Sequence, residues 1–266
     1  MIERLCDKRV SPIGIGTWGI GGWIFSDNKS DKQQKAAIRF AVENGINVID
    51  TAELYGRGHA EELVCDAIKG VDREGLFVIS KVWPTHLNRS GIRKALSASL
   101  QRLGMKYLDM YLIHWPNPVA SMKEAIGTME ELVDEGIIRS FGVSNFGVLD
   151  MQEAIDATKK YEIGANQIEY SLLKKGPEKE IIPFCEKNKI VVIAHTPLAQ
   201  GKLADSQALD ELSKKYKKPK VQVALNYLMR NSLPIPRSSN IGHLKEIIGT
   251  MEWGLEDSDY RQLREL

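Results

Sequence analysis

The sequence lacks the features that mark several large classes of protein. Its three cysteines, Cys6, Cys65 and Cys185, lie far apart and form no CxxC pair, which argues against a zinc site or a redox disulfide. No stretch approaches the ~18 consecutive apolar residues of a membrane span, and the first residues lack the apolar core of a signal peptide. We therefore expect a cytoplasmic protein with no membrane partner.

An excess of charge of either sign is also absent. Lysines and arginines number 36 against 35 aspartates and glutamates, which leaves a formal net charge of +1. This balance provides no large positive field to hold nucleic acid. The five histidines are scattered with no HxH or HExxH spacing, so a metal-dependent hydrolase or isomerase is disfavoured. We expect a small-molecule substrate and no metal.

What the sequence does contain is an alternation of short apolar runs with amphipathic stretches, about every 30 residues, typical of βαβ units around a parallel sheet. Eight strands are predicted near residues 13–16, 46–50, 76–80, 108–113, 138–143, 164–168, 190–194 and 233–236. A doubly wound sheet shares this alternation, but eight units in about 250 residues favour a (β/α)8 TIM barrel. We expect one α/β domain over residues 1–266, monomeric or weakly associating.

Helix ends are marked by capping residues. Two predicted capping boxes pair Ser30 with Gln33 and Ser121 with Glu124. Three glycines stand where C-terminal caps belong, at Gly45, Gly104 and Gly136. Further helices are expected within 219–231 and 254–266.

Polar residues follow the apolar runs where a barrel places its active site, at the C-terminal ends of the strands. Asp50, Lys81 and His114 end or follow three successive predicted strands, and Tyr55 lies five residues beyond Asp50. Each alone is explained by a structural role such as a cap or a packed ring. Together they would bring a carboxylate, an ammonium and an imidazole around one phenol.

The phenol is the informative member of this group, because free tyrosine has a pKa near ~10 and is a poor acid at neutral pH. A neighbouring ammonium stabilises tyrosinate and lowers that pKa, and a carboxylate beyond it would hold the ammonium in place. Tyr55, Lys81 and Asp50 supply these parts.

At these residues the sequence resembles the aldo-keto reductase family, from about Ile13 to the end of the chain. The matching segments, in chain order, are Gly14-Ile15-Gly16-Thr17-Trp18, Asp50-Thr51-Ala52-Glu53-Leu54-Tyr55-Gly56 with Glu61, Ser80-Lys81-Val82-Trp83, Leu112-Ile113-His114-Trp115-Pro116 and Gly142-Val143-Ser144-Asn145-Phe146. The resemblance implies NADPH-dependent reduction of aldehydes and ketones. Asp50, Tyr55, Lys81 and His114 would be the catalytic residues, with Tyr55 the general acid and His114 orienting the carbonyl oxygen.

The same resemblance implies a cofactor site across the barrel mouth. Ser144, Asn145 and Gln167 would bind the nicotinamide carboxamide. The remaining implied cofactor residues are Gly16, Thr17, Trp18, Asp50, His195, Thr196, Pro197, Leu198, Gln200, Gly201, Arg237, Ser238, Ser239 and His243. A Rossmann fingerprint, Gly14-x-Gly16-x-x-Gly19, is also present. It lacks the helix that should follow at once, since helical periodicity begins only near Asp31.

Four positions depart from the family pattern. His195 stands where a larger aromatic ring usually stacks on the nicotinamide, and we expect the imidazole to stack with less area. Arg237 replaces the commoner lysine at the 2′-phosphate and suits it through its bidentate fork. His243 and Ile247 stand where an arginine and an asparagine are common. NADP is the expected cofactor, with NAD as the alternative.

The substrate cleft implied by the resemblance is aromatic. Its residues would be Trp18, Tyr55, Trp83, His114 and Trp115. The short connection between His114 and Ser121 predicts an open pocket with broad recognition. Two rival functions involve no catalysis. The first is an NADP-binding sensor module with the same fold, which would be distinguished by the absence of turnover. The second is a scaffold protein, which would leave the converging polar strand ends unexplained.

Overall fold

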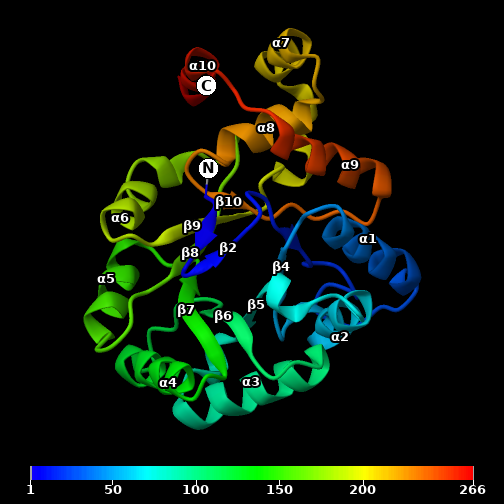
Figure 1. Ribbon diagram of the computed structural model, residues 1–266. Helices are drawn as coiled ribbons and strands as arrows, with labels where there is room; N and C mark the ends of the chain where they lie inside the picture. The colour runs from blue at the N-terminus through cyan, green and yellow to red at the C-terminus, as the bar shows by residue number, and fades with distance from the viewer. Residues whose placement is uncertain (1, 266) are drawn as a thin grey trace.

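The computed structural model describes residues 2–265 and contains an eight-stranded parallel sheet. Its strands are β3 (Ile15–Gly16), β4 (Val48–Asp50), β5 (Phe77–Val82), β6 (Leu108–Ile113), β7 (Ile138–Ser144), β8 (Ala165–Glu169), β9 (Val191–His195) and β10 (Leu233–Pro234). Each strand pairs with the next one along the chain. The ring closes through Gly14 N, which donates to Pro234 O at 2.9 Å, and Gly16 N, which donates to Pro236 O at 3.0 Å. The predicted α/β barrel is confirmed (Figure 1).

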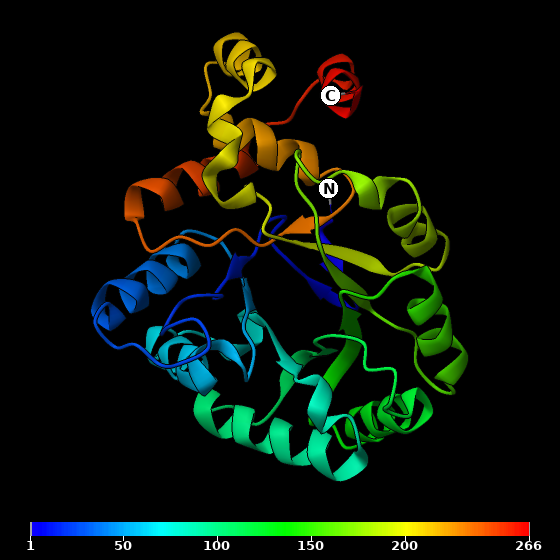
Figure 2. The same cartoon turned by 180° about the vertical axis from the view of Figure 1, so that it is seen from behind.

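Helices surround the sheet (Figures 1 and 2). The ring is formed by α1 (Asp31–Glu43), α2 (His59–Ala67), α3 (Arg89–Leu103), α4 (Met122–Asp134), α5 (Val148–Ala157), α6 (Ile181–Lys187), α8 (Lys220–Leu228) and α9 (Ile241–Gly249). Two more, α7 (Gln207–Tyr216) and α10 (Asp257–Glu265), lie outside the ring beyond α8 in both views. The helices expected within 219–231 and 254–266 are therefore present as α8 and α10.

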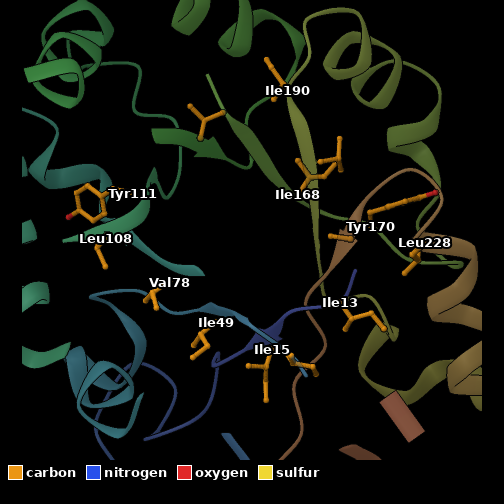
Figure 3. Close-up of a cluster of buried hydrophobic side chains, with 14 of the residues drawn as sticks. Ile13, Ile15, Ile49, Val78, Leu108, Tyr111, Ile168, Tyr170, Ile190 and Leu228 are labelled. Atoms are coloured by element: carbon orange, nitrogen blue, oxygen red, sulfur yellow. The ribbon is translucent and has the colours of Figure 1, made fainter. Parts of the chain in front are cut away.

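Two apolar cores follow from the alternation of side chains along each strand. Val48, Phe77 and Ile79 point into the barrel and pack in its interior cluster. Ile49 and Val78, their immediate neighbours in sequence, point outward and pack against the helices (Figure 3). Because both faces of the sheet are covered, the strands are mostly apolar, which is why they were recognisable in the sequence. Lys81, Asp109 and Gln167 are among the polar exceptions.

A short antiparallel hairpin, β1 (Arg4–Leu5) and β2 (Lys8–Arg9), precedes the barrel and was not predicted. Leu5 and Val10 are buried and join the interior cluster of the barrel. Apart from Leu5 and Cys6, residues 3–9 are all charged, so this segment has no apolar run that would mark a strand.

The helix caps agree with the sequence in part. Ser121 Oγ accepts from Glu124 N at 3.3 Å as predicted, but the Glu124 carboxylate accepts from Arg89 N instead of completing a box. The predicted cap at Ser30 is wrong: its ψ of 10° is far from the extended conformation that a capping side chain requires, and it makes no capping bond. The expected C-terminal caps are confirmed, since Gly45, Gly104 and Gly136 all have positive φ.

Candidate active site

Four predicted residues converge at the C-terminal ends of the strands. Asp50 ends β4, Lys81 lies in β5, His114 follows β6, and Tyr55 begins the short helical turn η1 (Tyr55–Gly58). Lys81 Nζ lies 2.8 Å from Asp50 Oδ1 and 3.0 Å from the Tyr55 hydroxyl. It also donates to the carbonyl of Thr51 at 2.9 Å. All three ammonium donors are thus used, and the lysine is fully buried.

A buried carboxylate, Glu61, anchors the helix that follows the Tyr55 turn. Glu61, in the first turn of α2, accepts from Ser80 Oγ at 2.6 Å and from Arg102 Nε at 2.7 Å. These bonds tie α2 to β5 and α3. Gly58 has a φ of +93°, and a Cβ there would lie 2.3 Å from Arg102 Nε, so only glycine allows this approach.

The electrostatics of Tyr55 reflect two opposing effects. Burial raises the pKa of Tyr55 above its usual range, and the positive charge of Lys81 only partly offsets this. The net direction therefore differs from the lowering that the ammonium alone would cause. Burial also disfavours the charged form of Lys81, but Asp50 and Tyr55 outweigh it and raise the pKa of the lysine. Tyr55 is accordingly a protonated phenol beside a charged ammonium.

His114 lies against Tyr55 as a neutral ring. The two ring centroids are 5.7 Å apart with planes at 73°, and burial, with Lys81 adding to it, lowers the pKa of His114 to about 2. Nδ1 is buried and has no hydrogen-bond partner among the described residues. A proton there would bury an unpaired donor, so the favoured neutral form carries its proton on Nε2.

These residues open into a cleft of about 1130 Å³ at the barrel mouth. This exceeds the roughly 300–1,000 Å³ of an ordinary small-ligand pocket, so a small carbonyl compound would leave most of it empty. The predicted residues that line it are Gly16, Trp18, Asp50, Tyr55, Trp83, His114, Trp115, Ser144, Asn145, Gln167, His195, Thr196, Pro197, Leu198, Gln200, Gly201, Arg237, Ser238 and His243. Three do not line it: Thr17, Ser239 and Lys81, the last of which lies behind Asp50 and Tyr55.

One wall of the cleft is a chain of hydrogen bonds that reaches the buried ion pair. Ser144 Oγ donates to Gln167 O at 3.0 Å, and Gln167 Nε2 donates to Asp50 Oδ1 at 2.7 Å. Asn145 follows Ser144 with a φ of +62°, a conformation that asparagine tolerates better than most residues. These polar groups at the ends of β7 and β8 can bind an amide beside the phenol.

The opposite end of the cleft is suited to an anion. Arg237 Nη2 donates to Gly19 O at 3.2 Å, and none of the carboxylates whose side chains the structure describes lies within 4 Å of its guanidinium. Burial lowers the pKa of Arg237, yet an arginine stays charged. The amino end of α9 lies nearby, where Asn240 accepts from the backbone of Gly242 and His243. A guanidinium beside a helix amino end is a favourable phosphate environment.

The apolar wall contains residues that sequence reasoning missed. Trp23, Ile24 and Leu54 line the cleft alongside the predicted tryptophans. Trp23 packs edge-on against Trp18 with ring centroids 5.2 Å apart, and Trp18 packs in turn against Tyr55 at 4.9 Å. The available signal was an apolar run, 23–25, in a glycine-rich loop where solvated residues are the norm.

Comparison with known proteins shows the family of the chain. A model of the aldo/keto reductase family matches residues 12–266. The chain belongs to the aldo/keto reductase family. The resemblance drawn from the sequence motifs is therefore confirmed, and the chain is an oxidoreductase of this family.

Individual members are similar over nearly the whole chain. Methylglyoxal reductase YeaE of Escherichia coli strain K12 is 33% identical over 270 residues, covering 99% of this chain and 93% of the relative. The crystal structure of a thermostable aldo-keto reductase, Tm1743, bound to the inhibitor epalrestat, superposes with a TM-score of 0.94 at 36% identity, covering 100% of this chain and 98% of that one. The crystal structure of an aldo/keto reductase from Klebsiella pneumoniae in complex with NADP and acetate superposes with a TM-score of 0.91 at 34% identity, covering 99% of this chain and 94% of that one.

Neither a membrane-spanning helix nor a metal-binding cluster is found among the described residues. No helix among them is long and apolar enough to cross a membrane. Among the histidine, cysteine, aspartate and glutamate side chains that the structure describes, no group of three or more has the geometry to hold a metal ion.

Proposed function

We propose that this aldo/keto reductase uses NADPH to reduce aldehydes and ketones to alcohols, with Tyr55 as the proton donor. The observation that carries the proposal is the contact of Lys81 with both Asp50 and the Tyr55 hydroxyl, at 2.8 and 3.0 Å, at the edge of the cleft. A buried ion pair has no need of a phenol. A phenol that must give up a proton does need an adjacent positive charge.

The cleft fits a dinucleotide. Its volume of about 1130 Å³ leaves room for a cofactor and a small substrate together. Ser144, Asn145 and Gln167 would hold the carboxamide of the nicotinamide beside Tyr55. Arg237 and Ser238 would hold the 2′-phosphate at the far end. The structure of the Klebsiella pneumoniae relative with NADP supports this choice of cofactor.

When bound, the cofactor supplies the hydride that adds to the carbonyl carbon. Tyr55 gives its proton to the carbonyl oxygen, so that a C–H and an O–H bond form while the C=O double bond becomes single. The resulting tyrosinate is stabilised by Lys81, which Asp50 holds in place. Protonation from solvent restores the phenol.

His114 would orient the carbonyl oxygen. Its pKa of about 2 keeps the ring neutral, so it serves as a hydrogen-bond donor and not as an acid. The proton on Nε2 provides that donor. Oxygen held between Nε2 of His114 and the Tyr55 hydroxyl would be polarised from two sides.

Preference for NADPH over NADH is proposed from Arg237. Its guanidinium has no carboxylate within 4 Å among the side chains that the structure describes, and it can pair with a 2′-phosphate. His243, where a second arginine is common in the family, limits the preference. We expect NADH to be accepted with lower affinity.

The substrate side of the cleft favours uncharged aldehydes. Trp18, Trp23, Trp83 and Trp115 supply aromatic surface there. Trp18 and Trp115 are 40% and 46% exposed, so the pocket is open to solvent and the contacts are broad. The relative named a methylglyoxal reductase supports small dicarbonyl compounds as further candidates.

Steady-state oxidation of NADPH with 4-nitrobenzaldehyde tests the proposal. Parent protein should turn over, and Tyr55→Phe should lose about 10²–10⁴-fold in kcat while still binding NADPH. Repeating the assay with NADH measures the cofactor preference. Tight NADPH binding without turnover across a panel of carbonyl compounds would favour the sensor function instead.

A further inference from the structure

His195 ends β9 and lines the cleft, where its ring makes two hydrogen bonds. Nε2 lies 3.0 Å from Oδ1 of Asn145, and Nδ1 lies 3.1 Å from Oγ1 of Thr196. Asn145 follows β7, and β8 lies between β7 and β9 in the sheet. The first contact therefore joins the ends of two strands that are not neighbours.

The direction of this hydrogen bond follows from the other partners of Asn145. Its Nδ2 lies 3.1 Å from the carbonyl oxygen of His114 and 3.0 Å from Ser144 Oγ. A carbonyl can only accept, so the amide nitrogen must face His114 and the amide oxygen must face His195. The imidazole therefore carries its proton on Nε2, and Nδ1 accepts from the Thr196 hydroxyl.

Asn145 depends on these bonds for its position. Its backbone lies at a φ of +62°, which costs energy for any residue with a Cβ. Its backbone N–H donates to Gln167 O at 2.8 Å, and its amide is bound by His114, Ser144 and His195. Without His195, Oδ1 loses its protein donor and the amide can rotate away from the strand ends.

We propose that His195 is a positioning residue of the cofactor site, which acts by donating Nε2–H to Asn145 and so fixes the amide that borders the nicotinamide. The sequence alone suggested stacking for this ring. The inference rests on the proposed function, because it assumes that the nicotinamide binds beside Asn145. Burial, with Lys81 adding to it, lowers the pKa of His195 to about 4, so one neutral tautomer persists at neutral pH.

The tautomer can be tested without cofactor. ¹⁵N NMR of the histidine rings, with His195 assigned by comparison with His195→Gln, should give a neutral imidazole protonated on Nε2. A proton on Nδ1, or averaging between the two nitrogens, would overturn the inference.

Cofactor affinity provides the second test, measured as quenching of tryptophan fluorescence by NADPH. His195→Phe retains a ring that stacks but removes the donor, and we expect Kd to rise about 5- to 30-fold. His195→Gln keeps an N–H at similar reach and should stay within about threefold of the parent. In an Asn145→Ala background, His195→Phe should change Kd by less than about twofold, because the bond is already gone.

Stacking makes the opposite prediction. His195→Phe would then bind NADPH as tightly as the parent, or would change Kd equally in the parent and Asn145→Ala backgrounds. Either result would contradict the proposal. The thermal unfolding midpoint of each variant serves as the folding control. Parent protein that fails to bind NADPH overturns this inference and the proposed function together, whereas binding without turnover overturns the proposed function alone.

Discussion

Each end of the barrel buries a carboxylate that is paired with at least one cation, but of these two sites only the one at the mouth lines the large cleft. At the mouth, Asp50 is bound by Lys81 and by Gln167. At the opposite end, Asp109 is bound by Lys8 at 2.8 Å and Arg73 at 2.6 Å, and it also accepts from Val78 N. Both carboxylates are 2% exposed.

The difference lies in what surrounds each pair. Lys8 and Arg73 reach Asp109 with side chains that are 26% and 23% exposed, and the aromatic partner there, Tyr107, lies under Arg73 and bonds to an exposed glutamate. Lys81 is fully buried and touches a phenol at the wall of a large cleft. A buried ion pair by itself indicates no catalytic role. It becomes part of an active site when it adjoins a proton donor that a ligand can reach.

Replacing the lysine at each end should separate the two roles most strongly. In Lys81→Met, Tyr55 loses the charge that stabilises its anion, and kcat with NADPH should fall about 10²–10⁴-fold. The pKa of Tyr55 should rise further, so that in a pH titration the absorbance of its tyrosinate form appears at higher pH than in the parent. Lys8→Met is the matched control, with kcat within about twofold of the parent. Equal losses in both variants would mean that general destabilisation explains the effect.

Replacing the aspartate at each end should separate stability from turnover. Asp109→Asn leaves two cations without their carboxylate and should lower the free energy of unfolding by about 3 kcal/mol in urea titrations, with kcat per folded molecule unchanged. Asp50→Asn should lose most of its turnover, because Lys81 is no longer held. A large fall in kcat for Asp109→Asn would contradict the division between the two ends.

Within the mouth, the cofactor end can be tested separately. Arg237→Met should raise KM for NADPH about 10- to 100-fold through loss of a charged hydrogen bond to phosphate, and leave KM for NADH nearly unchanged. Arg230→Met removes an ion pair between Arg230, which follows α8, and Asp257 of α10; it is the control and should alter neither value. Equal effects on both cofactors would place Arg237 away from the 2′-phosphate.

The substrate wall should give a smaller effect. Trp23→Ala removes aromatic surface from the cleft, and KM for 4-nitrobenzaldehyde should rise about 3- to 10-fold with little change for a two-carbon aldehyde. Leu149→Ala, at an 85% exposed position on α5, is the control. An unchanged KM for the aromatic aldehyde in Trp23→Ala would show that this tryptophan does not contact substrate.

The sequence predicted the mouth of the barrel better than its closed end. Strand ends are marked by a switch from apolar to polar residues, so Asp50, Lys81 and His114 were recognisable, and all eight strands were found. The hairpin at 4–9 lies in a charged segment with no apolar run to mark it. The contacts of Asp109 with Lys8 and Arg73 join segments that are distant in the sequence. Trp23 was missed because its ring contact with Trp18 depends on the fold of the loop, and the residue itself is 58% exposed. The direction of the pKa shift of Tyr55 could not be predicted from the sequence, because it depends on how deeply the phenol is buried.

The smallest expected effect is that of pH. A general acid must be protonated to act. Because burial raises the pKa of Tyr55, the phenol stays protonated to a higher pH than a free tyrosine would. His114, with a pKa of about 2, stays neutral throughout. At saturating NADPH and aldehyde, kcat should therefore vary less than about twofold from pH ~5.5 to ~8.5, where an ordinary histidine would titrate. A step in kcat near pH ~6.5 would instead identify a group with an ordinary imidazole pKa in the rate-limiting step, and His114→Gln would show whether that group is His114.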